Sequence, residues 1–169
     1  MLLLMLGGAL GTYLRYAVGK WFNSQPWAQG FPYGTLFINV TGSFILAAAA
    51  MILLERLPPK HQDWYLLIGT GFCGGYTTFS TFEYETARLI EDRDFLHAFF
   101  YVTLSFAVGL MAVWGGIFAA RWMAQAPLLN SIIETERSTQ AISGVPVMDE
   151  LEMANLNGGR ESVEPKDRS

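Results

Sequence analysis

Cysteine is nearly absent from this sequence, and its first 125 residues show no excess of either charge. The single Cys73 excludes an internal disulfide and says nothing about the redox compartment. Up to Gln125 there are 7 Lys and Arg against 7 Asp and Glu, and no basic cluster indicates a nucleic-acid partner. The sequence has no phosphate-binding loop, dinucleotide fingerprint or nucleophile–base pair, and His61 and His97 are isolated. These absences argue against an enzyme and against a histidine-based metal site.

Aromatic residues are missing from the C-terminal part of the chain. All 12 Phe, 5 Trp and 7 Tyr residues precede Ala126, and residues 125–169 carry 4 Lys and Arg against 8 Asp and Glu. This tail alone therefore supplies the formal net charge of −4. We predict that it is polar and mostly disordered, with short helix-forming stretches at 131–136 and 149–153. Residues 1–124 are predicted to form a single domain in the membrane.

Four long apolar runs predict an all-α membrane protein with four transmembrane helices. The runs cover residues 2–22, 33–54, 64–89 and 95–120. The second run has 22 residues without a charge, which is enough to cross a hydrocarbon core of ~30 Å. Trp21, Trp64 and Trp122 lie near the ends of these runs, as interfacial indoles do. The first run lacks the charged start of a signal peptide and carries Arg15, so we interpret it as a span.

The third run contains an unusual patch, residues 69–82, that is rich in glycine and hydroxyl groups. Gly71, Gly74 and Gly75 predict an interruption of the helix, and Gly74, Gly75 and Thr77 are expected to bear on the break. Backbone groups freed by a break inside a membrane must face protein, water or an ion. We therefore interpret the patch as a site that binds one ion and lines a path for another.

Several side chains inside the runs have both a structural and a functional interpretation. Arg15 either extends to the membrane interface or forms a cationic vestibule that attracts an anion. The amide of Asn39 either bonds a neighbouring helix or donates to an anion. Phe79 and Phe82 share a helix face and either pack or offer electropositive ring edges to a small anion. Ser105 either bonds its own backbone or adds a hydroxyl to the path.

Positive charge does not fix the orientation of the four predicted spans. Three cations fall on the side of the termini and three on the other side: Arg56, Lys60 and Arg121 against Lys20, Arg88 and Arg93. Because charge bias normally sets orientation, either adjacent features decide it or the chain inserts in both directions and forms an antiparallel dimer. Separately, the small residues Gly7 to Gly11 predict a close helix–helix contact in the first span.

Three motifs resemble those of the CrcB/Fluc fluoride channels. They are GGALGTYLRY at 7–16, GTLFINVTGSF at 34–44 and GFCGGYTTFSTF at 71–82. The resemblance covers residues 2–124, with the motifs in the same order and spacing, and the third motif is highly specific. Tyr76 is bulkier than the aliphatic residue usual there, which bears on packing beside the break. The tail lies outside the resemblance.

The resemblance implies an antiparallel dual-topology homodimer with two fluoride pores, in which the breaks of the two third spans cross. It implies a structural sodium ion held by the backbone carbonyls of Gly74 and Thr77 from both subunits. Phe79 and Phe82 would supply ring edges along the pores and Asn39 would donate to fluoride. Arg15 would lie toward the vestibule, and Ser80, Thr81 and Ser105 would add hydroxyls to the pathway.

The function that the resemblance implies is passive export of fluoride across the plasma membrane, which relieves fluoride toxicity. Two alternatives remain open at this point. A proton-coupled fluoride carrier would need a titratable group in the path, and Glu83 and Glu85 follow the third motif, although we expect them toward the membrane edge. A non-conducting membrane scaffold would use the tail to recruit a partner.

Overall fold

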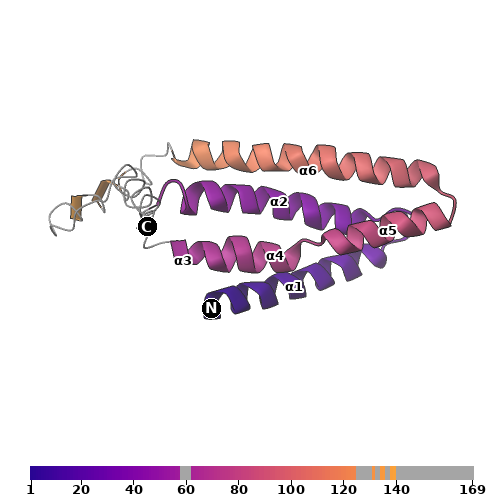
Figure 1. The fold of residues 1–169 in the computed structure, drawn as a ribbon, viewed down its shortest axis with the longest axis horizontal. Coiled ribbons are helices and arrows are strands. Elements are labelled where there is room, and N and C mark those ends of the chain that lie inside the picture. The colour runs from indigo at the N-terminus through magenta and orange to yellow at the C-terminus, as the bar shows by residue number, and fades with distance from the viewer. Residues whose placement is uncertain (58–61, 125–130, 132–133, 136–137, 140–169) are drawn as a thin grey trace, which may run out of the picture. The chain divides into compact units, whose positions relative to one another are not determined.

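The computed structural model describes residues 1–57, 62–124, 131, 134–135 and 138–139. Within the first two of these ranges every regular element is a helix (Figure 1). Three of the predicted spans are confirmed as long helices: α1 (Leu2–Asn23), α2 (Tyr33–Leu53) and α6 (Phe95–Ala124). All three are long and apolar enough to cross a membrane. Of the two predicted stretches of the tail, 149–153 lies outside the described residues, whereas 131–136 is described at 131, 134 and 135, which are helical. Lys60 and His61 also lie outside the described residues.

The third apolar run is divided into four consecutive helical pieces. They are α3 (Gln62–Tyr65), the π-helix η3 (Leu66–Cys73), α4 (Gly74–Tyr76) and α5 (Phe79–Glu91). The longest piece has 13 residues, which is too short to span a bilayer alone. Figure 1 shows the pieces following one another along the bundle, so together they cover the length of a span.

Short polar links join the helices. The link between α1 and α2 contains a turn of 3₁₀-helix, η1 (Pro26–Ala28), followed by Gly30 at a φ of 94°. At the link between α5 and α6, Asp94 precedes α6. Its carboxylate accepts from the backbone N–H of His97 at 3.3 Å and so caps the start of the helix. Figure 1 shows the beginning of α1 and the end of α6 at the same end of the bundle, as an even number of crossings requires.

Glycines allow α1 to lie directly against η3 and α4. Gly7 and Gly11 are buried, and a Cβ on either would collide with the carbonyl oxygen of Leu67 or Phe72. A Cβ on Gly75 would lie 2.5 Å from the carbonyl oxygen of Gly8. The close helix contact predicted from the small residues of the first span is therefore confirmed.

The second close contact joins α2 and α6. A Cβ on Gly116 would collide with the carbonyl oxygen of Phe44 and lie 3.2 Å from Cβ of Ala47. Large apolar side chains instead cover the outside of the bundle, with Phe118 73% and Trp122 71% exposed. Such a surface is suited to lipid or to a second membrane protein rather than to water.

Candidate functional site

The helical hydrogen bonding of the third run ends at Thr77, whose N–H still donates to the Cys73 carbonyl at 2.9 Å, and the Thr78 N–H donates to a side chain instead. Both residues have extended backbone, with φ −79° and ψ 159° for Thr77 and φ −152° and ψ 115° for Thr78. The sequence-based expectation that the glycines interrupt the helix is wrong in its location. Gly71 lies within the π-helix, and Gly74, at φ −63° and ψ −36°, lies in α4 with Gly75. Gly71 and Gly75 instead allow the close approach of α1, since added Cβ atoms would collide with its carbonyls.

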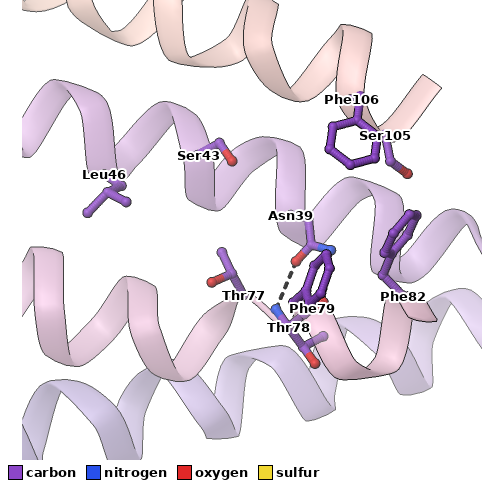
Figure 2. Close-up of a pocket in the computed structure, with 9 residues that line it drawn as sticks. All are labelled: Asn39, Ser43, Leu46, Thr77, Thr78, Phe79, Phe82, Ser105 and Phe106. Atoms are coloured by element: carbon purple, nitrogen blue, oxygen red, sulfur yellow. Dashed lines mark hydrogen bonds between the residues drawn. The ribbon is translucent and has the colours of Figure 1, made fainter. Parts of the chain in front are cut away.

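Asn39 of α2 pairs with the backbone of Thr78 through both ends of its side-chain amide. The Thr78 N–H donates to Oδ1 at 2.8 Å (Figure 2). Nδ2 in turn donates to the Thr78 carbonyl at 3.1 Å. In a continuous α-helix the Thr78 N–H would donate to the carbonyl of Gly74. Asn39 therefore accepts from the Thr78 N–H in place of the Gly74 carbonyl, and this hydrogen bond stabilises the extended backbone.

The Thr78 hydroxyl starts the next helix. It accepts from the Thr81 N–H at 3.2 Å and donates to the Thr81 hydroxyl at 2.9 Å, which is the geometry of an N-cap. The Ser80 hydroxyl lies 3.5 Å away. This cap fixes the direction in which α5 leaves Thr78, and so it places Phe79 and Phe82.

A cavity of about 250 Å³ lies beside the break, between α2, α5 and α6 (Figure 2). It brings together residues far apart in the chain: Asn39, Ser43, Leu46, Thr77, Thr78, Phe79, Phe82, Ser105 and Phe106. The ring centroids of Phe79 and Phe82 are 5.9 Å apart. Phe82 is 8% exposed and also packs on Tyr101, whereas Phe79 is 65% exposed. The cavity is therefore apolar on one wall and lined by an amide and hydroxyls elsewhere.

The Ser105 hydroxyl is buried and has no hydrogen-bond partner among the described residues. A serine hydroxyl in a membrane helix usually donates to a backbone carbonyl one turn earlier, and that bond would satisfy it. Here Ser105 lines the cavity, so its hydroxyl is available to a polar occupant. Buried polar atoms without partners are rare and often mark a binding function.

A second cavity of about 580 Å³ lies on the other side of Thr78. It is lined by charged and hydroxyl side chains of α1, α2 and α5, among them Arg15, Lys20, Thr35, Thr78, Thr81 and Glu85. Thr78 lines both cavities and so separates them. Of the sequence-predicted site residues, Arg15 and Thr81 lie here, whereas Ser80 is exposed and lines neither cavity.

Arg15 lies near the break as well as in the second cavity. Its guanidinium donates to the carbonyl of Thr77 at 3.4 Å, a long hydrogen bond. The carbonyl has two lone pairs and can accept a second partner. Arg15 is therefore neither a lipid-facing anchor nor a free charge, because it interacts with the same backbone that Asn39 holds.

Sequence reasoning missed a group of residues around Glu85. The Thr35 hydroxyl donates to one carboxylate oxygen at 2.9 Å and the Tyr101 hydroxyl donates to the other at 2.7 Å. Tyr101 is fully buried and Glu85 half-buried, whereas the neighbouring Glu83 is exposed. A buried acid needs such partners. The sequence around Glu83 and Glu85 does not indicate that Glu85 is hydrogen-bonded, because the donors come from two other helices.

Within the described residues no cluster of His, Cys, Asp and Glu could hold a metal ion. Any cation at the break would have to be bound by backbone carbonyls, which are ligands typical of hard cations. The Gly74 carbonyl has lost its helical donor, because the Thr78 N–H donates to Asn39 instead. This carbonyl is therefore suited to a further ligand.

Comparisons with known proteins agree with these features. The profile of a family described as "CrcB-like protein, Camphor Resistance (CrcB)" matches residues 2–117. A "Fluoride-specific ion channel FluC" of Acidobacterium capsulatum is 47% identical over 116 residues, which are 66% of this chain and 88% of the relative. Another, FluC 1 of Listeria innocua, is 44% identical over 116 residues, covering 69% of this chain and 92% of the relative.

A third FluC, from a Sulfurihydrogenibium species, is 37% identical over 122 residues, or 72% of this chain and 97% of that protein. The matched region takes in α1, α2, the divided third run and most of α6, including every residue of the first cavity. The relatives' names are those of membrane channels and not of enzymes. On this combined similarity in sequence, the chain belongs to the CrcB-like protein family.

Proposed function

We propose that this chain is a fluoride-specific ion channel of the plasma membrane that exports fluoride passively and so relieves fluoride toxicity. The observation that carries the proposal is the cavity beside the break, which gathers Asn39, Phe79, Phe82 and Ser105 from three helices. The relatives named as fluoride-specific ion channels support the choice of ion. Fluoride that enters an acidified cell as HF would leave through this pathway.

The lining of the cavity suits a small, strongly hydrated anion. The side-chain nitrogen of Asn39 donates one of its two hydrogens to the Thr78 carbonyl. We assign the second hydrogen as a donor to fluoride. The unpartnered Ser105 hydroxyl supplies another donor. Edges of Phe79 and Phe82 are weakly electropositive and attract the ion without trapping it. Conduction needs such weak, successive sites.

Arg15 and Thr81 belong to the approach to this path. Both line the second cavity, where the cation raises the local concentration of anions. We assign the Ser80 and Thr81 hydroxyls to the pathway as secondary donors, because both interact with the Thr78 hydroxyl that separates the cavities.

The active assembly that we propose is an antiparallel dual-topology homodimer. The equal number of cations at the two ends of the predicted spans supports insertion in both directions. Phe79 is 65% exposed in the single chain, and a partner would cover it and complete the wall of the pore. Exposed apolar side chains along α6, such as Phe106 and Trp114, offer further surface to lipid or a partner.

We further propose that the carbonyls of Gly74 and Thr77 from both subunits hold a structural sodium ion where the two breaks cross. The Thr78 N–H donates to Asn39 and not to the Gly74 carbonyl, and this supports the fit. The Thr77 carbonyl would share its second lone pair while Arg15 donates to the first. A bound cation would interact favourably with the carbonyl dipoles at the break.

The direct test is fluoride efflux from liposomes that contain only the purified full chain. We expect efflux driven by the fluoride gradient alone, with no chloride efflux under the same gradient. Equal fluoride and chloride efflux would overturn the selectivity, and absence of fluoride efflux from liposomes with folded protein would overturn the function.

One observation keeps the proton-coupled carrier as a second candidate. Glu85 is a titratable group that lines the larger cavity, with Thr35 and Tyr101 on its oxygens. A carrier would move fluoride in response to a pH gradient at equal fluoride concentrations, whereas a channel would not. Removal of residues 126–169 tests the scaffold alternative, since a channel should keep its efflux without the tail.

A further inference from the structure

Tyr76 is the last residue of α4, directly before the extended residues, and its side chain reaches α2. The residue is 4% exposed and its ring stacks on Phe72, with centroids 5.5 Å apart and planes at 14°. Its hydroxyl lies 3.1 Å from the hydroxyl of Thr41. Tyr76 thus adds a polar contact beside the break.

The direction of this hydrogen bond follows from counting hydrogens. The Thr41 hydroxyl lies 2.7 Å from the Phe37 carbonyl and 3.2 Å from the Ile38 carbonyl, and it donates to them. A threonine hydroxyl has a single hydrogen and two lone pairs. The Tyr76 hydroxyl is therefore the donor and the Thr41 oxygen is the acceptor.

Together with Asn39, this bond holds Thr77 from both sides. Asn39 pairs with Thr78, which follows Thr77, and Thr41 accepts from Tyr76, which precedes it. The contact is tight, because a Cβ on Gly42 would collide with the Thr77 methyl group and lie 3.2 Å from a ring carbon of Tyr76. A short segment of α2, residues 39–42, thus fixes the backbone on either side of the Thr77 carbonyl.

We propose that Tyr76 and Thr41 are positioning residues that set the direction of the Thr77 carbonyl and thereby the affinity of the break for sodium. The inference rests on the proposed function, which assigns this carbonyl to the ion. Without the Tyr76 hydroxyl, α4 keeps its contact with α1 but loses its hydrogen bond to the Thr41 hydroxyl of α2. The carbonyl then samples more directions, and a cation must order it when it binds.

The test uses the purified full chain in detergent and measures thermal unfolding over a series of sodium concentrations at constant ionic strength. A ligand that binds only the folded state adds stability by RT ln(1 + [L]/Kd), so the unfolding temperatures over the series give the Kd for sodium. We expect Tyr76→Phe and Thr41→Val each to raise this Kd by about fivefold, as for one neutral hydrogen bond. The double variant should match the single ones, because both remove the same bond.

Tyr84→Phe is the matched control, since Tyr84 is 65% exposed on α5 and lines neither cavity. Its sodium response should equal that of the wild type. Lower stability of Tyr76→Phe at every sodium concentration with an unchanged Kd for sodium would overturn the inference, as would additive effects in the double variant. A wild-type chain that sodium does not stabilise would overturn it too. A normal sodium response without fluoride efflux would overturn the proposed function alone.

Discussion

Asn39 and Thr78 are 39 positions apart, yet they form a reciprocal pair in which the amide both accepts from and donates to one peptide group. Two hydrogen bonds replace those that the backbone forgoes when it leaves the helix at Thr78. An unpaired peptide group in a membrane would cost several kcal/mol, on the order of the values for buried polar groups in apolar media. Asn39 is therefore the residue on which the shape of the break depends most directly.

Asn39→Asp should abolish most of the fluoride efflux. The variant keeps the size of the side chain but replaces the donor to the Thr78 carbonyl with an acceptor, and it adds negative charge to the proposed path. Leaving a buried polar group unsatisfied costs ~1–3 kcal/mol, so we expect efflux from liposomes to fall by roughly 10- to 100-fold.

Gln29→Glu makes the same amide-to-acid change at an exposed position of the α1–α2 link and should leave efflux unchanged. Retention of wild-type efflux by Asn39→Asp would remove this residue from the pathway. Cross-linking in the membrane should show that both variants keep the subunit association of the wild type.

Phe79→Ile should also lose efflux while the protein remains folded. Isoleucine preserves apolar bulk but has no aromatic ring, so it lacks the electropositive edge. We expect a fall of at least about tenfold, which corresponds to ~1.4 kcal/mol, in the same liposome measurement.

Phe99→Ile is a close control, because Phe79 and Phe99 are both 65% exposed and only Phe79 lines the cavity. If exposure of an aromatic ring to lipid or a partner were the property that matters, both variants would lose efflux equally. That outcome would contradict the assignment of Phe79 to the path.

Gly11→Ala should destabilise the domain. Its new Cβ would collide with the Phe72 carbonyl, a backbone atom that cannot move aside without shifting the whole helix. Overpacking of this kind costs ~1–3 kcal/mol. Gly109→Ala, where a Cβ meets nothing within 4 Å, should instead be neutral or stabilise α6 by ~0.5–1 kcal/mol. Thermal unfolding in detergent compares the two, and equal losses would contradict the close α1–η3 contact.

These residues show how far the sequence could predict the structure. The helices and the α1 contact follow from local signals, namely apolar runs and the spacing of Gly7 and Gly11. The position of the break does not follow from such signals, because the glycines that predict an interruption lie in the helical pieces before it. Its actual position depends on Asn39, whose amide lies on another helix and takes the Thr78 N–H. Hydrogen bonds across helices leave no periodic pattern in the chain.

The same limit applies to the cavity and to Glu85. Asn39, Phe79, Phe82 and Ser105 were each singled out, but only the packing of α2, α5 and α6 shows that they line one space. The partners of Glu85 come from α2 and α6, so its sequence neighbours gave no hint of them. The sequence indicates the chemical character of each residue singly, but it does not indicate which of these residues lie close together.

Asp94→Ala should lower stability in a way that depends on pH. Hydrogen bonds from the ring and then from the backbone N–H of His97 lower the pKa of Asp94 from its ordinary value of 3.8. The folded state therefore favours the carboxylate, and this stabilisation is present above the ordinary pKa and is lost as pH falls through the lowered one. Thermal unfolding should show the largest loss near neutral pH and a shrinking loss below about pH 4.

Asp92→Ala is the control, because no hydrogen bond of the Asp92 carboxylate is seen within the described part of the chain. It should show no such pH dependence. A constant difference between Asp94→Ala and the wild type across the whole pH range would contradict the cap.

Ser105→Ala separates a structural from a functional hydroxyl. The Ser105 hydroxyl is buried with no partner among the described residues, so its removal relieves an unsatisfied group and should leave stability unchanged within ~0.5 kcal/mol or raise it. Fluoride efflux should nevertheless fall about tenfold, since a donor in the cavity is lost. Thr86→Val removes a hydroxyl that bonds the Phe82 carbonyl at 2.8 Å outside the cavity, and its efflux should be unchanged. A Ser105→Ala protein with normal efflux would show that this hydroxyl serves no ion, and one that unfolds more readily would show that it has a structural partner instead.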